Sequence, residues 1–223
     1  MAELSIRRTK GDTDNEAGTL SRVGEVHAAC SPDRKPYPAA DTSIGLREYA
    51  ARSHDDPVTN VTRLARPGDR AGALDVWQLA NTARGKAPGQ ERIARVQAKL
   101  ADPAALVIVA ERSGELAGMA LAEAGRDRDG TGGVLPGLCH ISMVFVRPGH
   151  WGNRIGELLL DAVGEQAVRR GQALLQLWTG EGNQRALRLY ARCGFRPSGR
   201  TGLLGTGERI IHLTRRSLPE GQV

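Results

Sequence analysis

The chain has 223 residues, of which 40% are hydrophobic, and its net charge is +6. This length and hydrophobic content suit a globular protein with one substantial core or one core and an appendage. No apolar run approaches the roughly 18–20 residues of a membrane-spanning helix, and the first residues have no apolar stretch typical of a secretory signal. The three cysteines, Cys30, Cys139 and Cys193, are widely spaced and in no metal-binding pattern, so we expect a cytoplasmic protein without a metal site.

The positive charge is uneven along the chain. Residues 1–57 hold 8 Lys/Arg against 10 Asp/Glu, whereas residues 58–223 hold 23 against 15. A basic domain can bind nucleic acid, but it can equally bind a small polyanion such as a nucleotide cofactor. Because the arginines are scattered and form no dense run, we expect the small polyanion rather than nucleic acid.

The first predicted elements begin after a polar segment. Residues 1–57 lack sustained periodicity and are rich in Asp, Ser, Pro, Gly and Ala, so we interpret them as an N-terminal extension that can be flexible. From Val58 the segment VTNVTRLA predicts a strand. Asp69 is a candidate N-cap for a helix that reaches about Ala83, and a second helix fits residues 90–100.

Three strands and a loop are expected next. ALVIVAERSGELAGMALAEA predicts a hairpin that turns at Ser113 and Gly114, followed by a loop over residues 126–137. LCHISMVFV predicts a strand with two different faces. Strict alternation puts Cys139, Ile141, Met143 and Phe145 on one face and His140, Ser142, Val144 and Val146 on the other.

The remaining elements alternate between helix and strand. We expect a helix over about residues 152–170, a strand ALLQLW, a helix from Asn183 and a last strand over residues 209–214. This order predicts one mixed α/β domain over residues 58–215, followed by a short tail at residues 216–223.

The turn VRPGHWGNRIG leads from an apolar strand straight into a helix. Gly152 and Gly156 allow a ligand to approach the backbone closely, and the helix N-terminus offers N–H groups to an anion. Arg147 and Arg154 could attract a phosphate there. The alternative is an ordinary strand-to-helix turn, because glycine pairs are common.

The segment NQRALRLYARCGF carries the second motif. Asn183 is a good N-cap, and Tyr190 follows two turns later on the same helix face. A phenol can protonate a departing thiolate, although the transfer is uphill by roughly 2 kcal/mol unless a positive environment lowers the phenol pKa. The alternative is that Tyr190 is a half-buried core residue.

Together the two motifs resemble the GNAT-type N-acetyltransferase superfamily. The family shows Arg/Gln-x-x-Gly-x-Gly/Ala after its fourth strand, and here Trp151 and Arg154 depart from that pattern. The second family pattern, Asn-x-x-Ala-x-x-x-Tyr…Gly-Phe, is matched by Asn183, Ala186, Tyr190, Gly194 and Phe195. The resemblance covers about residues 58–215 and implies an α+β sandwich, a mixed and mostly antiparallel sheet flanked by helices.

The resemblance also implies acetyl-CoA as co-substrate. Its pyrophosphate would lie on the backbone of Trp151, Gly152, Asn153, Arg154, Ile155 and Gly156. Its pantetheine arm would run along Val144, Phe145 and Val146, and Asn183 would contact it. Tyr190 would be the general acid, and the reaction would be direct attack of an amine on the thioester in a ternary complex.

The attacking amine must lose a proton, because a lysine-like amine is protonated at pH 7. Many relatives carry a Glu on the fourth strand, and the matching position here is His140, whose ordinary pKa suits a base. Glu123, which ends the preceding strand, is a rival, and His140 could instead be a packed strand residue. Where enzymes that acetylate ribosomal-protein N-termini carry a Glu, this chain has Trp178, which argues against that substrate.

We therefore expect a cytoplasmic N-acetyltransferase that acts on a primary amine of a small molecule, with neither nucleic acid nor membrane as partner. The alternatives are a protein lysine or N-terminal acetyltransferase and a non-catalytic acyl-CoA-binding module. A peptide needs an open cleft and a small amine a closed one, and we expect residues 126–137 and 201–208 to line it. Relatives often dimerise, so a homodimer stays open.

Overall fold

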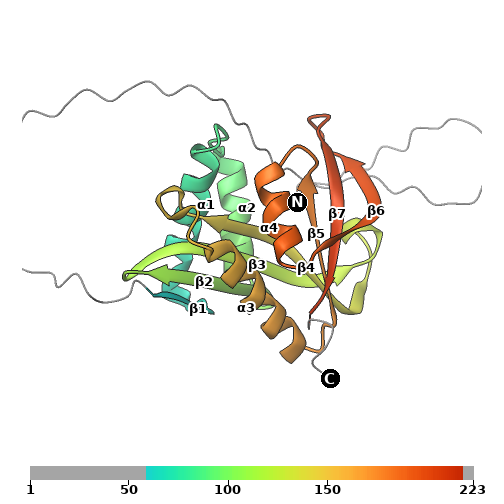
Figure 1. Cartoon of the computed structure of the whole chain (residues 1–223), viewed down its shortest axis with the longest axis horizontal. Helices are drawn as coiled ribbons and strands as arrows, with labels where there is room; N and C mark the ends of the chain where they lie inside the picture. Colours follow the sequence, from blue (N-terminus) through green and yellow to red (C-terminus); the bar gives the residue numbers. More distant parts are fainter. Residues whose placement is uncertain (1–58, 218–223) are drawn as a thin grey trace, which may run out of the picture.

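The computed structural model describes residues 59–217, which form a seven-stranded sheet with helices on both faces (Figure 1). The strand order is β1-β2-β3-β4-β5-β7-β6, and every neighbouring pair is antiparallel except the parallel pair β4 and β5. The predicted mixed, mostly antiparallel sheet is thus confirmed. The predicted extension at residues 1–57 and the end of the predicted tail lie outside the described residues.

The α-helices and strands follow one another in the predicted order, with one additional strand and three short 3-10 helices (η1, η2 and η3). The first half consists of β1 (Asn60–Leu64), η1 (Pro67–Asp69), α1 (Arg70–Thr82), α2 (Gln90–Ala101), β2 (Leu106–Arg112), β3 (Glu115–Arg126) and η2 (Arg128–Gly130). The second half consists of β4 (Val134–Val146), η3 (Pro148–His150), α3 (Ile155–Arg169), β5 (Leu174–Gly180), α4 (Gln184–Arg192), β6 (Arg196–Leu203) and β7 (Arg209–Arg216). The additional strand is β6, whose sequence RPSGRTGL has no apolar alternation and contains residues that weaken strands.

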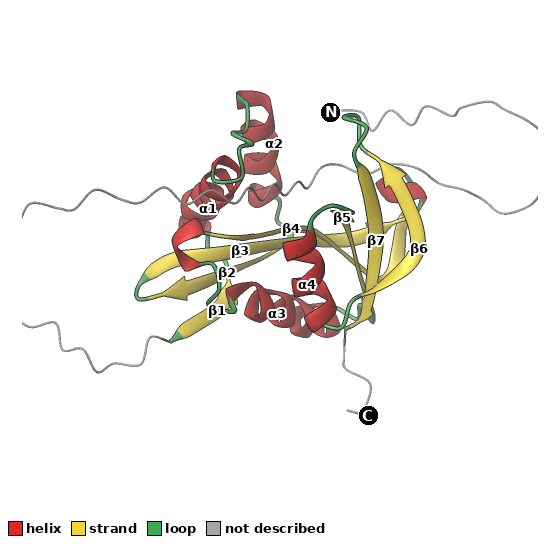
Figure 2. Ribbon diagram, turned by 45° about the horizontal axis from the view of Figure 1, so that its top comes forward, coloured by secondary structure: helices red, strands yellow, loops and turns green. Residues whose placement is uncertain are grey.

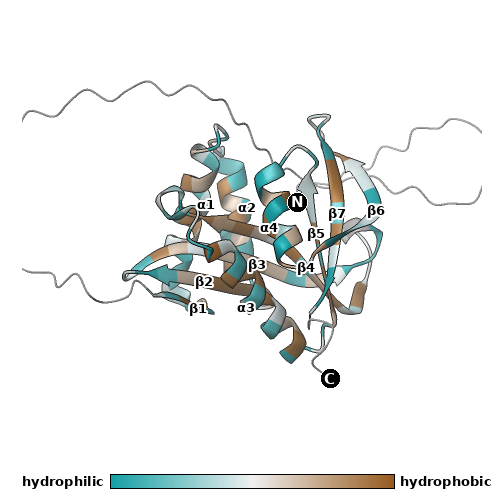
Figure 3. Cartoon of the chain, viewed as in Figure 1, coloured by the Kyte–Doolittle hydropathy of each residue, from teal (hydrophilic) through white to brown (hydrophobic). Residues whose placement is uncertain are grey.

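Two hydrophobic cores lie on the two faces of the sheet. α1 and α2 cover one face, where Val76 and Trp77 pack on strand residues such as Met119, and α3 and α4 cover the other (Figure 2). In Figure 3 the hydrophobic residues are concentrated on the central strands β2 and β3. Among the described residues, no helix is long and apolar enough to span a bilayer.

Two local predictions have different outcomes. The hairpin between β2 and β3 turns at Ser113 and Gly114, both with positive φ, as expected for a two-residue turn. Asp69 does stand at the N-cap of α1, but its carboxylate does not cap that helix. Instead it accepts hydrogen bonds from Arg66 N and from the Arg63 guanidinium, which ties β1 to η1.

A β-bulge in β4 makes the predicted faces of that strand wrong beyond Ser142. Leu121 of β3 lies opposite Met143, whereas the next residue, Ala122, lies opposite Ile141, so Ser142 is the extra residue. One extra residue reverses the two-residue alternation. Residues Cys139, Ile141, Val144 and Val146 therefore pack in the α3–α4 core, and Met143 and Phe145 pack in the α1–α2 core.

β4 and β5 part soon after they pair. The ladder joins only Leu138, Cys139 and His140 to Leu174, Leu175 and Gln176. We call the diverging segments, residues 141–146 of β4 and 177–180 of β5, the fork. Each arm keeps its pairing on its outer side, with β3 and β7 respectively, so the inner edges carry backbone groups that no β-ladder uses.

Candidate functional site

The loop between β4 and α3 presents a row of backbone N–H groups. Gly152 and Arg154 have φ of +90° and +59°, and Asn153 between them has negative φ, an alternation that turns successive N–H groups toward one point. Within the described part of the chain, none of the amides from residue 152 to residue 156 donates a hydrogen bond. These amides, which we call the cradle, stand at the N-terminus of a 15-residue helix and so favour an anion.

The arginines predicted to attract a phosphate are already engaged. Arg147 donates to the Leu116 carbonyl and pairs with Asp75 of α1, and Arg154 pairs with Glu157 at 2.9 Å. A different cation lies at the loop: Arg185, whose Cζ is 4.3 Å from the centre of the Trp151 ring. Arg185 was not among the predicted site residues, because α4 meets the loop only in the tertiary structure.

Trp151 and Asn153 hold the loop in place. Trp151 Nε1 donates to the Val146 carbonyl at 2.8 Å, which fixes the loop to the end of β4. Asn153 Nδ2 donates to the His150 carbonyl, and its own carbonyl accepts from Asn60 Nδ2 of β1 at 3.1 Å. The edge strand β1 therefore supports the loop from outside.

The α4 helix lies against α3 close to the loop. A Cβ added at Gly156 would lie 2.9 Å from Leu189 Cδ2, so the glycine allows the two helices to approach. Asn183 Oδ1 accepts from Ala186 N at 3.1 Å, which confirms the predicted N-cap. A cofactor contact from Asn183 stays a prediction.

Tyr190 is buried on the α3–α4 face, where its ring meets the edge of Phe195 at a centroid distance of 5.8 Å. Burial raises the pKa of Tyr190 to about 12, an effect that the charge of Arg84 only partly opposes. Proton transfer to a thiolate of ordinary pKa about 8.5 is then uphill by roughly 5 kcal/mol. A lowered phenol pKa would assist this transfer, whereas the surroundings of Tyr190 raise it.

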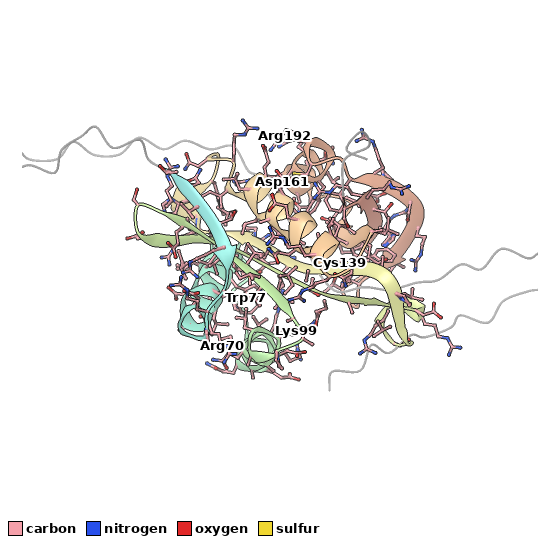
Figure 4. The ribbon with its side chains drawn as sticks, turned by 90° about the horizontal axis from the view of Figure 1, so that it is seen from below. Arg70, Trp77, Lys99, Cys139, Asp161 and Arg192 are labelled. Carbon is pink, nitrogen blue, oxygen red and sulfur yellow. The ribbon has the colours of Figure 1, made fainter. Side chains whose placement is uncertain are left out.

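A cleft of about 430 Å³ opens on the opposite face of the sheet, between α2 and strands β3, β4 and β5. Figure 4 shows the two faces: Lys99 of α2 lies on one side of the sheet, and Asp161 and Arg192 of α3 and α4 lie on the other. The polar and aromatic side chains that line the cleft are Lys99, Asp102, Glu123, Arg126, His140, Ser142, Gln176 and Trp178.

The cleft brings the two candidate bases together. His140 is the cross-strand neighbour of Glu123 on one side and of Gln176 on the other. Glu123 Oε2 accepts from Lys99 Nζ and from Ser142 Oγ, both at 2.5 Å. Burial would raise the pKa of Glu123, but these two hydrogen bonds outweigh it and the pKa is lowered.

Only one of the two predicted lining segments reaches this cleft. Arg126, Gly130 and Val134 line it, but none of residues 201–208 does. The β6–β7 connection instead meets the α1–α2 connection, where Lys86 Nζ lies 4.0 Å from Glu208 Oε2. Within residues 59–217 no three His, Cys, Asp or Glu side chains are grouped as metal ligands would be.

Known proteins resemble this chain over the same region. Residues 73–195 match the model of the Acetyltransferase (GNAT) family. An uncharacterized N-acetyltransferase of Mycobacterium tuberculosis is 32% identical over 126 residues, which cover 56% of this chain and 75% of that relative.

Two solved structures share the fold. The ribosomal-protein-S18-alanine N-acetyltransferase from Escherichia coli has a TM-score of 0.55 at 19% identity and covers 74% of this chain and 99% of its own. A putative acetyltransferase from Salmonella typhimurium, solved with its cofactor acetyl-CoA, has a TM-score of 0.56 at 20% identity. The match covers 74% of this chain and 98% of that chain.

Proposed function

This chain belongs to the acetyltransferase (GNAT) family, and from that membership we propose that it transfers the acetyl group of acetyl-CoA to a primary amine of a small molecule. The observation that carries the proposal is the arrangement around the fork. The cradle and Tyr190 lie on the α3–α4 side of the sheet, and the polar cleft lies on the α2 side. The strands β4 and β5 diverge between the two. A donor and an acceptor can thus approach the same point from opposite faces.

The residues on the α3–α4 side fit the co-substrate. The cradle offers backbone amides that no described protein group uses, which suits the pyrophosphate, and the guanidinium of Arg185 adds a positive charge beside it. The backbone of Val144, Phe145 and Val146 and the amide of Asn183 would hold the pantetheine arm. Acetyl-CoA supplies the thioester carbonyl that the amine attacks.

We assign the general base to His140. Glu123 already accepts two hydrogen bonds and its pKa is lowered, so its carboxylate is the weaker base of the pair. The two residues are cross-strand neighbours that both line the cleft, so the negative charge of Glu123 lies close to the imidazole of His140. Deprotonation of a lysine-like amine at pH 7 costs roughly 4–5 kcal/mol, so a base held beside the amine contributes directly to the rate.

We assign the general acid to Tyr190. It lies on the face of the sheet opposite His140, so the proton that leaves the amine and the proton that reaches the thiolate move on separate sides of the fork. The raised pKa keeps the phenol protonated throughout the neutral range of pH. It also leaves the proton transfer to the thiolate uphill by roughly 5 kcal/mol.

The size of the cleft supports a small acceptor. A volume of about 430 Å³ lies in the range of small-molecule sites, and α2 and the segment between β3 and β4 form part of its wall. Trp178 in its wall adds an apolar surface. We further propose that the catalytic unit is the cytoplasmic domain of residues 58–215.

The first test is release of free thiol from acetyl-CoA with pools of amino acids, polyamines, aminoglycosides and short peptides. We expect turnover with a small-molecule pool. Turnover with peptides alone would establish the protein-acetylating alternative. Acetyl-CoA binding without turnover in any pool would leave either the non-catalytic alternative or an acceptor outside the pools.

The second test separates the two bases by the variants His140→Gln and Glu123→Gln. If His140 is the base, His140→Gln removes the acidic limb of the pH profile of kcat/KM, and Glu123→Gln shifts that limb without removing it. The opposite pattern would assign the base to Glu123.

A further inference from the structure

A chain of hydrogen bonds crosses the far end of the sheet and ends at the cleft. Arg200 N lies 3.3 Å from Ser198 Oγ, Ser198 Oγ lies 2.7 Å from His212 Nδ1, and His212 Nε2 lies 3.0 Å from Gln176 Oε1. The residues come from β6, β7 and β5, and only Gln176 among them lines the cleft.

The direction of this chain is determined by its last member. Gln176 Oε1 can only accept, so His212 Nε2 donates to it. A neutral imidazole that carries its proton on Nε2 has an acceptor at Nδ1, so Ser198 Oγ donates to His212 Nδ1. Ser198 Oγ in turn accepts from the backbone N–H of Arg200.

The neutral state of His212 keeps this direction constant. His212 is only 3% exposed, and burial lowers its pKa to about 4, with Arg200 and His140 adding to the effect. Its ring also lies 4.8 Å from the ring of Trp178, which fixes its position. A doubly protonated ring, which would change the hydrogen-bond pattern, is therefore disfavoured near neutral pH.

With its oxygen held, Gln176 can offer only its NH2 group to the cleft. In the described part of the chain this Nε2 makes no hydrogen bond, and Gln176 is the cross-strand neighbour of His140, the assigned base. Neighbouring strands lie about 4.8 Å apart. A group bound by Gln176 and an amine beside His140 are thus separated by only a few bonds.

We propose that Gln176, oriented by His212, selects acceptors that carry an oxygen hydrogen-bond acceptor within two or three bonds of the reacting amine. This class contains α-amino acids, their amides and 2-amino alcohols, and it excludes alkyl monoamines and polyamines. Gln176 is then a specificity-determining residue that contacts the acceptor, and His212 is a positioning residue. The inference rests on the proposed amine acetylation and names its acceptor class.

The experiment compares three probes that share a phenethylamine core: phenylalaninamide, phenylalaninol and phenethylamine itself, of which only the last lacks the oxygen-bearing substituent. The readout is kcat/KM from thiol release, expressed as the ratio of each oxygen-bearing probe to phenethylamine. We expect a ratio of at least tenfold for the wild-type protein. A site built to donate to an oxygen discriminates strongly against the analogue that lacks it.

Gln176→Glu keeps the shape of the side chain and its acceptor toward His212, but replaces the donor NH2 by an oxygen. We expect the ratio to fall at least tenfold in this variant and in His212→Phe, mainly through KM of the oxygen-bearing probes. Gln97→Glu is the matched control, because it makes the same change at an exposed position of α2 outside the cleft. Acetyl-CoA affinity, measured by calorimetry, reports whether each variant is folded.

The outcomes are distinguishable. An unchanged ratio in an active, folded Gln176→Glu protein would overturn the inference and leave the proposed function standing. A wild-type protein that binds acetyl-CoA but acetylates none of the three probes nor any pooled amine would overturn both.

Discussion

The indole Nε1 of Trp151 donates a hydrogen bond to the carbonyl oxygen of Val146 at 2.8 Å, and this contact joins the cradle to the end of β4. The family pattern has an Arg or Gln at the position of Trp151. In this chain the ring instead supports the guanidinium of Arg185, so a cation reaches the loop from α4. With Trp151 at this position, the positive charge at the loop is supplied from α4 by Arg185.

The variant Trp151→Phe tests this contact, since it retains an aromatic ring for Arg185 but removes the N–H donor. A neutral hydrogen bond contributes about 1 kcal/mol, so we expect the Kd for acetyl-CoA to rise about fivefold. Titration calorimetry measures it. A Kd within twofold of the wild-type value would show that the hydrogen bond does not order the cradle.

The variant Gly152→Ala tests the cradle itself. Gly152 has φ of +90°, where a Cβ costs roughly 1–2 kcal/mol, so alanine should distort the amides and weaken acetyl-CoA binding by about tenfold. Gly149→Ala is the control, because Gly149 lies in the same loop with ordinary φ and no atom within 4 Å of an added Cβ. Equal effects of the two variants would contradict a role for the left-handed backbone.

The variant Tyr190→Phe removes the phenol proton and keeps the packing on Phe195. General acid catalysis typically contributes 10²–10⁴-fold, so we expect kcat to fall about 100-fold or more with Kd for acetyl-CoA nearly unchanged. Steady-state kinetics with the best acceptor measures it, and thermal melting verifies the fold. An unaltered kcat would remove Tyr190 from the chemistry.

The buried His212 predicts a loss of stability in acid. Its folded pKa of about 4 lies below the unfolded value of 6.5, so the unfolded chain binds more protons between these values. The stability from neutral His212 is therefore present above pH 6.5 and declines as the pH falls toward 4. Between pH 7.5 and 5.0 the decline is about 2 kcal/mol.

Denaturant unfolding of the wild-type protein and of His212→Phe at these two pH values measures this decline. The variant has lost two hydrogen bonds and should be less stable at both, but its pH dependence should be smaller by about 2 kcal/mol. Parallel pH profiles would mean that His212 titrates normally in the folded protein.

We expect a substitution at Thr179 of β5 to stabilise the fold. Its side chain is fully buried, and its hydroxyl has no hydrogen-bond partner among the described residues. Thr179→Val removes this desolvated hydroxyl at constant shape and should stabilise the fold by about 1 kcal/mol. The control Thr201→Val, at an exposed position of β6, should change the melting temperature little. Destabilisation by Thr179→Val would mean that the hydroxyl has a partner in the folded protein.

The sequence by itself determined the family and most of the secondary structure. The strongly periodic helices, the hairpin at Ser113 and Gly114, the glycine-rich turn before α3 and the Asn183 cap all depend on residues close together in the chain. Short-range patterns record such features directly, because propensity, capping and turn geometry act within a few residues. The strand β6 could not be predicted in this way, since its own pattern is weak and its pairing with β7 holds it.

Only the tertiary structure decided which residues face each core and which residues from distant segments are in contact. The bulge at Ser142 depends on the register with β3, and it moved Val144 and Val146 to the α3–α4 core. Burial raised the pKa of Tyr190, whereas assistance to the thiolate would have required a lowered one. The contacts of Arg185 with Trp151, and of His212 with Gln176, join residues 34 and 36 positions apart, and no local pattern encodes them. Strand register, burial and long-range pairing arise when separate elements pack together. The folded chain then minimises the free energy of the whole domain rather than that of each separate segment.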